Sequence, residues 1–106
     1  MARHIDFTQH PESIELAAHA IGLDHKRPYI RHGKFFYRPY RNYFTAADNT
    51  HDFHVWKELC EKGYARFRQG NSAASHDYKH GTFWLTRAGL DWLSKALGIT
   101  IFDEED

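Results

Sequence analysis

Residues 53–70 read FHVWKELCEKGYARFRQG and residues 82–93 read TFWLTRAGLDWL, and within them the period of the apolar residues changes twice. Up to Gly63 the apolar residues recur every three or four positions, as in an amphipathic helix, and beyond it they alternate with arginines, as in a strand. In the second stretch an extended apolar run ends at Thr86, after which leucines recur at helical spacing. The two stretches therefore predict a helix, two strands and another helix.

Capping residues set the expected limits of these elements. Thr50 is suited to cap a helix over residues 51–62, and Thr86 is suited to cap a helix that Gly98 closes. The other predicted segments are a strand at 64–68, a polar tip at 70–75, a return strand at 82–85 and an edge strand at 99–102. The side chains expected in the core between these elements are Trp56, Trp84, Leu90 and Leu93.

The first half of the chain combines a helix with an aromatic hairpin. Apolar residues recur at helical spacing over residues 11–21, and Gly22 stands where a C-terminal cap belongs. Residues 29–37 read YIRHGKFFY, in which His32-Gly33 favours a tight turn between two short strands. Pro39 ends the second strand, and the spacing of the aromatic residues after it predicts a single turn of helix over Tyr40, Tyr43 and Phe44.

Length and composition indicate one domain over residues 1–106. A chain of this length supports one modest core, and eight Phe, six Tyr and three Trp make that core aromatic. The single cysteine, Cys60, excludes an internal disulfide and is typical of a reducing compartment. No apolar run approaches the roughly 18 residues of a membrane span, and the N-terminal residues lack the apolar segment of a signal peptide. We therefore expect a cytoplasmic protein without a membrane partner.

Charge is segregated along a chain whose formal net charge is zero. No acidic residue lies between Asp24 and Asp48, although that stretch holds six cations, and residues 103–106 are all acidic. This distribution predicts a molecule with a basic side and an acidic tail, although the tail is equally well interpreted as a frayed, solvated end.

Residues 53–93 resemble the winged helices of the MarR type. The shared pattern is a helix ending in Leu-x-x-x-Gly-aromatic, two strands around a polar tip, and Leu-Thr-x-x-Gly at the start of the next helix; it is carried here by Leu59, Gly63, Tyr64, Arg66, Leu85, Thr86, Gly89 and Leu93. The resemblance implies a winged-helix-like α+β fold with three helices and a β-hairpin wing, to which this chain adds the N-terminal aromatic basic hairpin. It also implies a homodimer joined through terminal helices. The short, aromatic-rich chain with an acidic end is, in addition, similar to small bacteriophage proteins.

Two features depart from that family. MarR-type wings carry an Asp-x-Arg pair, whereas residues 76–79 here read HDYK and lack the arginine. The family also has a firm helix where this chain has its basic hairpin. Since winged helices serve as protein-binding modules as well as DNA readers, the resemblance does not fix a function.

The charges of the helix at 51–62 are poorly suited to binding in a DNA major groove. Its exposed positions include Asp52, Glu58 and Glu61, and Asp48 lies just before it. Phosphates repel carboxylates, and recognition helices favour Arg, Lys, Asn and Gln at base edges. The sequence therefore favours another surface.

The favoured surface is the hairpin region, where cations alternate with aromatic rings. Cations bind phosphates, and unpaired bases stack on rings. The predicted binding residues are Lys26, Arg27, Tyr29, Arg31, Lys34, Phe36, Arg38, Tyr40 and Arg41, joined by Arg66 and Arg68 on the wing. We expect their charges to be exposed and to contribute little to stability.

Three interpretations of this surface are open. The first is a regulatory or accessory protein that binds nucleic acid. The second is a protein-interaction module, such as a phage-encoded modulator of a host factor, because Tyr and Arg also mark protein interfaces. The third is a structural surface on which arginines cover tyrosine rings.

Neither catalysis nor metal binding is predicted. The nine histidines include pairs three and four apart, at 51 and 54 and at 76 and 80, but they lack the converging ligands of a zinc site. The chain has no glycine-rich phosphate loop, nucleophile elbow or evident carboxylate pair, and general acid–base chemistry by His32, Lys34 and Tyr37 is a ribonuclease-like alternative without a supporting motif. We expect a protein that acts by binding, without cofactor or metal.

Overall fold

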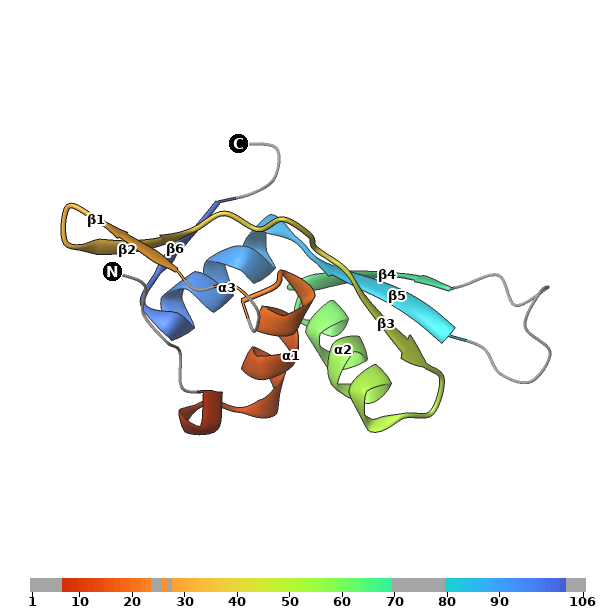
Figure 1. The fold of residues 1–106 in the computed structure, drawn as a ribbon. Helices are drawn as coiled ribbons and strands as arrows, with labels where there is room; N and C mark the ends of the chain where they lie inside the picture. Colours follow the sequence, from red (N-terminus) through yellow and green to blue (C-terminus); the bar gives the residue numbers. More distant parts are fainter. Residues whose placement is uncertain (1–6, 24–25, 27, 70–79, 103–106) are drawn as a thin grey trace.

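Three helices lie along one side of two small sheets in an α+β arrangement (Figure 1). The computed structural model describes residues 7–23, 26, 28–69 and 80–102, so the predicted polar tip, the acidic tail and Arg27 lie outside the described residues. In chain order the elements are the short 3-10 helix η1 (Phe7–Gln9), α1 (Glu12–Ala20), β1 (Tyr29–Arg31), β2 (Lys34–Tyr37), β3 (Phe44–Ala47), α2 (His51–Glu61), β4 (Ala65–Gln69), β5 (His80–Leu85), α3 (Arg87–Leu97) and β6 (Thr100–Ile101).

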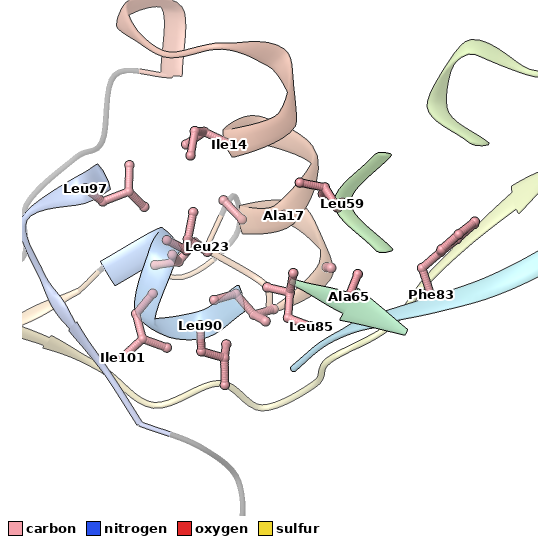
Figure 2. Packing of buried hydrophobic residues seen from close by; sticks show 14 of the residues in the cluster. Ile14, Ala17, Leu23, Leu59, Ala65, Phe83, Leu85, Leu90, Leu97 and Ile101 are labelled. Atoms are coloured by element: carbon pink, nitrogen blue, oxygen red, sulfur yellow. The ribbon is translucent and has the colours of Figure 1, made fainter. Parts of the chain in front are cut away.

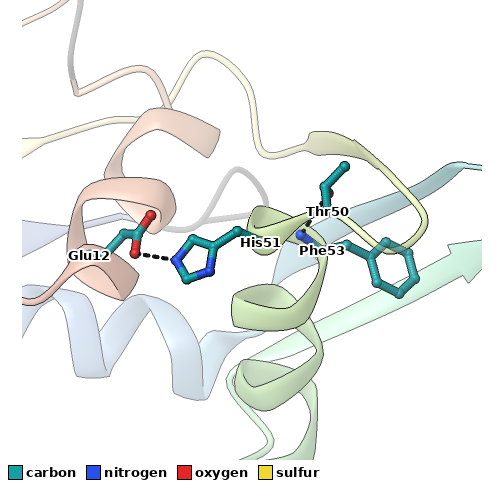
Figure 3. Close-up of polar contacts among 4 residues, drawn as sticks. All are labelled: Glu12, Thr50, His51 and Phe53. Carbon is teal, nitrogen blue, oxygen red and sulfur yellow. Dashed lines mark hydrogen bonds and ion pairs between the residues drawn. The ribbon is translucent and has the colours of Figure 1, made fainter.

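The helices begin and end close to the predicted residues because local capping fixes their limits. The Thr50 hydroxyl accepts a hydrogen bond from the Phe53 amide at 3.2 Å at the start of α2 (Figure 3). At the start of α3, the Thr86 hydroxyl accepts one from the Gly89 amide at 3.1 Å, and Gly98 closes the helix with a φ of 68°. Among the described residues, no helix has the length and apolar character that a membrane crossing requires.

The predicted hairpin is confirmed and belongs to a sheet with the strand order β1-β2-β6. His32 and Gly33 have φ angles of 53° and 77°, the pair of positive values that a type I′ turn requires. β6 pairs with β2 in parallel, with Tyr37 opposite Ile101, and the Phe102 amide donates to the Tyr37 carbonyl at 3.0 Å. The C-terminal strand predicted at 99–102 therefore forms an edge of the hairpin's own sheet.

The second sheet is antiparallel, with the order β3-β5-β4, and it overturns one prediction. Where aromatic spacing predicted a helical turn, the chain is extended and Phe44–Ala47 forms β3. The strand conformation sets Phe44 opposite Phe83, and the Asn42 side chain exchanges two hydrogen bonds with the Leu85 backbone, each 2.9 Å long. Pairing with β5 thus satisfies backbone groups that an isolated helical turn would leave to water.

The hydrophobic core lies between the helices and the inner faces of both sheets (Figure 2). The predicted burial of Trp56, Leu90 and Leu93 is confirmed, with exposures of 0%, 3% and 0%. The prediction that Trp84 belongs to this core is wrong, because the residue is only partly buried and lies outside the core cluster. Its neighbours Phe83 and Leu85 both point into the core, so strand alternation turns the indole to the opposite face.

Candidate functional site

The outer face of the hairpin's sheet carries five of the eleven predicted binding residues. Tyr37 lies on the inner face, where it is 2% exposed and its hydroxyl donates to the Ile21 carbonyl at 2.7 Å. Alternation and register therefore turn the neighbouring positions outward, with Tyr29 opposite Phe36 and Arg31 opposite Lys34. We call this face, made of Tyr29, Arg31, Lys34, Phe36, Arg38 and Phe102, the hairpin platform.

Three aromatic rings of the hairpin platform form a row across the sheet. The ring centroids of Tyr29 and Phe36 are 5.9 Å apart with an interplanar angle of 27°, and those of Phe36 and Phe102 are 5.9 Å apart at 11°. The Arg38 guanidinium carbon lies 4.9 Å from the Phe102 ring centroid. Tyr29, at the other end of the row, is 44% exposed. A planar group can extend the row from that end.

The cations of the hairpin platform lie side by side. Arg31 and Lys34 are direct cross-strand neighbours and both are exposed. Like charges in this position repel each other. Within the described part of the chain neither side chain contacts a carboxylate. An anion bound between them would relieve the repulsion.

Lys26, Tyr40 and Arg41 form a separate cluster near the end of α1. The Tyr40 ring has the Lys26 ammonium 4.7 Å and the Arg41 guanidinium carbon 5.4 Å from its centroid. An Arg41 nitrogen donates to the His19 carbonyl at 2.8 Å, and a Cβ on Gly22 would lie 2.3 Å from the Tyr40 ring. Arg41 therefore supports the fold, and the prediction that its charge is exposed and dispensable is wrong.

Arg66 and Arg68 project from β4 on the outer face of the second sheet. Arg66 is the cross-strand neighbour of Trp84, and Arg68 is the neighbour of Thr82. Both arginines are exposed. The structure thus separates the predicted site residues into the hairpin platform, the Tyr40 cluster and this second face, and it adds two aromatic residues that sequence reasoning did not include, Phe102 and Trp84.

The side chains of α2 include a histidine–carboxylate contact and exposed carboxylates, unlike the cations and rings of the hairpin platform. His51 Nε2 lies 2.6 Å from Glu12 Oε2, which joins α2 to α1 (Figure 3). The hydrogen bond and the negative charge of Glu12 raise the pKa of His51 above its ordinary value of 6.5. The Lys57 ammonium lies 4.5 Å from the Phe67 ring centroid. The carboxylates of Glu58 and Glu61 are on exposed positions of the same helix.

Charge separates between the two layers of the molecule. The six described strands contain four cations, Arg31, Lys34, Arg66 and Arg68, and no Asp or Glu. The described α-helices carry an excess of carboxylates. Their six acidic residues are Glu12, Glu15, Asp52, Glu58, Glu61 and Asp91, against the three cations Lys57, Arg87 and Lys95. Because the helices lie on one side of the sheets (Figure 1), the outer faces of the sheets are the basic side.

The described residues hold no group of three or more side chains that could bind a metal ion together. Cys60 is half-buried beside the core, and burial raises the pKa of its thiol. A thiol held in its neutral form is a weak nucleophile and a weak metal ligand.

Comparison of the chain with protein-family models, with curated proteins and with solved structures finds no match, so the functional argument depends on the geometry and charge described above.

Proposed function

We propose that this protein is a non-enzymatic, nucleic-acid-binding accessory or regulatory protein that binds through the hairpin platform. The observation that carries the proposal is that the six described strands contain no carboxylate. The hairpin platform carries instead a row of aromatic rings next to the cations Arg31 and Lys34. Phosphates favour such a surface because cations replace the counterions that the nucleic acid releases. Rings next to those cations add stacking for bases.

The proposal includes a scaffold of winged-helix-like type. α2, β4, β5 and α3 follow one another as helix, wing strands and helix, and β3 pairs with the second wing strand. In this protein the helix that precedes the wing is acidic and is joined to α1 through His51 and Glu12. Binding by the sheets, and not by α2, is therefore the mode that the charges support.

A matched pair of variants tests the binding surface. Arg31→Gln with Lys34→Gln removes two exposed cations from the hairpin platform, whereas Lys57→Gln with Lys62→Gln removes two from α2 and from its C-terminal end. The platform variant should lower the slope of log K against log salt by about 1.4 for a single strand or about 1.8 for a duplex. The α2 variant should leave the slope unchanged, since its lysines lie on the acidic side.

Fluorescence anisotropy with labelled single-stranded and duplex oligonucleotides at several salt concentrations measures both slopes. Binding no tighter than tens of micromolar at low salt would overturn the proposal, and loss of binding only in the α2 variant would assign it to the helix. A protein captured by the chain with little salt dependence, and released by Phe36→Ala, would favour the interaction-module alternative.

A further inference from the structure

Trp84 places a partly exposed indole ring on the outer face of the second sheet, outside the hydrophobic core. Trp56 stacks on Phe83 with ring centroids 5.6 Å apart, and Trp92 stacks on Tyr64 at 5.0 Å. Trp84 stacks on no other ring within the described part of the chain, and it is partly exposed on the outer face of the second sheet. A large aromatic surface left partly in water is a site where a planar ligand gains by stacking.

Two arginines flank this ring without carboxylate partners. Arg66 is directly across the strand pair from Trp84, and Arg68 lies two residues further along β4. Within the described residues neither guanidinium takes part in an ion pair. We call Trp84, Arg66 and Arg68 the Trp84 platform. Its combination of a ring and two unpaired cations matches a base and its adjoining phosphates.

One extended stretch of chain, residues 34–47, joins this platform to the hairpin platform. It contains β2 at one end and β3 at the other, and it runs along the sheet side of the molecule (Figure 1). α3 packs against both β6 and β5, so the helices lie on the same side of both sheets. Both platforms therefore lie on the side away from the helices.

Exposed side chains continue across the gap between the platforms. Arg38 and Tyr43 are exposed along the connecting stretch, and Tyr43 directly precedes β3 at the level of Trp84. Phe36 and Tyr43 are seven steps apart along the chain, which span at most about 23 Å at the rise of an extended chain. A stacked strand that rises about 3.4 Å per nucleotide covers this distance with about seven nucleotides.

We propose that the ligand is a single strand of nucleic acid that crosses both sheets, with bases stacked on the hairpin platform at one end and on Trp84 at the other. The inference rests on the proposed function and specifies its substrate class. A duplex keeps its bases paired inside the helix, so it cannot stack them on two separate rings. A single strand of sufficient length engages both platforms at once, and its second contact benefits from a raised effective concentration.

Length dependence of binding tests this arrangement. The probes are dT4, which is too short to span both platforms, and dT12, which is long enough. Trp84→Leu keeps an apolar side chain but removes the ring, and it should weaken dT12 binding about 5- to 150-fold while leaving dT4 binding to the hairpin platform unchanged. Trp92→Phe, whose ring stacks on Tyr64, is the matched control and should alter neither.

Tryptophan fluorescence locates the contact directly. In the Trp92→Phe background the remaining indoles are Trp56, which is fully buried, and Trp84. We expect dT12 to quench the emission and dT4 to leave it unchanged. Arg66→Gln with Arg68→Gln should lower the salt slope for dT12 by about 1.4 and should not alter the slope for dT4.

The outcomes separate this inference from the proposed function. Equal binding of dT12 by Trp84→Leu and the unaltered chain, with no quenching, would overturn the two-platform arrangement and leave binding at the hairpin platform in place. A 12-base-pair duplex that binds as tightly as dT12 would overturn the assignment to a single strand. Failure of both oligonucleotides to bind at low salt would overturn both proposals. Unchanged dT4 binding and thermal melting in Trp84→Leu show that the variant is folded.

Discussion

Replacement of Gly89 by alanine probes the closest contact between α3 and the residues that precede β4. A Cβ on Gly89 would lie 1.9 Å from the Tyr64 carbonyl oxygen and 2.8 Å from the carbonyl carbon. That carbonyl also accepts a hydrogen bond from the Thr86 amide at 3.0 Å. It therefore cannot move away from an added methyl group without loss of the bond that positions the start of α3.

The expected effect on stability is the balance of three contributions. Overpacking costs about 1–3 kcal/mol, and a weakened hydrogen bond costs about 0.5–1.5 kcal/mol more. Alanine offsets up to about 1 kcal/mol through its higher helix propensity. We expect Gly89→Ala to lower the free energy of unfolding by about 2 kcal/mol and the melting temperature by about 10 °C.

Urea unfolding followed by circular dichroism measures this loss. Ala88→Gly is the control, because Ala88 is the exposed neighbour in the same helical turn and reports the propensity difference alone, a loss of about 0.5–1 kcal/mol. A Gly89→Ala variant as stable as the unaltered chain would refute the reasoning, since it would mean that α3 can move off Tyr64 freely.

Three further predictions concern the core, the helix contact and metals. Leu93→Ala should lower the free energy of unfolding by about 2–5 kcal/mol. Trp84→Ala removes a partly buried ring on the outer face and leaves no cavity in the core, so it should cost less, about 1–2 kcal/mol. Equal losses in chemical denaturation would contradict the assignment of faces. Glu12→Gln should lower the pKa of His51 toward its ordinary value in an NMR titration, because Glu12 is the main cause of the raised pKa, and an unchanged pKa would exclude the contact. Because that pKa is raised in the folded state, the pair contributes its full stability below pH 6.5, and the contribution is lost as the pH rises through the raised value. EDTA should leave the melting temperature unchanged, and native mass spectrometry should show the bare chain; a stoichiometric zinc ion would contradict this.

The elements that sequence reasoning predicted well are those fixed by neighbouring residues. Thr50 and Thr86 cap their helices through hydrogen bonds to amides three residues away, and His32-Gly33 forms the hairpin turn. These signals act over a few residues, so a single sequence is sufficient to find them. The three helices, the hairpin and the wing strands were therefore predicted close to their observed limits.

The two errors about the fold arise where residues far away in the sequence determine the local structure. The aromatic spacing up to Phe44 imitates a helix, but its conformation depends on β5, almost forty residues later in the chain. Phe83, Trp84 and Leu85 are all apolar, so their sequence does not reveal which face of the strand is buried. Burial of Phe83 and Leu85 decides this, and it turns Trp84 outward.

The candidate site was predicted in composition but not in arrangement. Composition identified Tyr29, Phe36 and the cations around them, because cations alternate with rings along that stretch. It could not identify Phe102, which joins the row only through the parallel pairing of β6 with β2. Nor could it separate Arg41, which bonds a helix carbonyl, from cations that remain exposed.

The stretch of residues 34–47 also determines which changes of chain length the protein can tolerate. The exposed positions are the even-numbered Lys34, Arg38 and Tyr40 before the connector ends and the odd-numbered Tyr43 and Thr45 after it, so the alternation shifts by one residue between the two sheets. One residue inserted or deleted in that interval would turn one sheet's inner side chains toward water. Substitutions on the outer faces do not change this alternation of buried and exposed positions. The connector between the sheets is therefore a segment of fixed length, in which side chains can vary but the number of residues cannot.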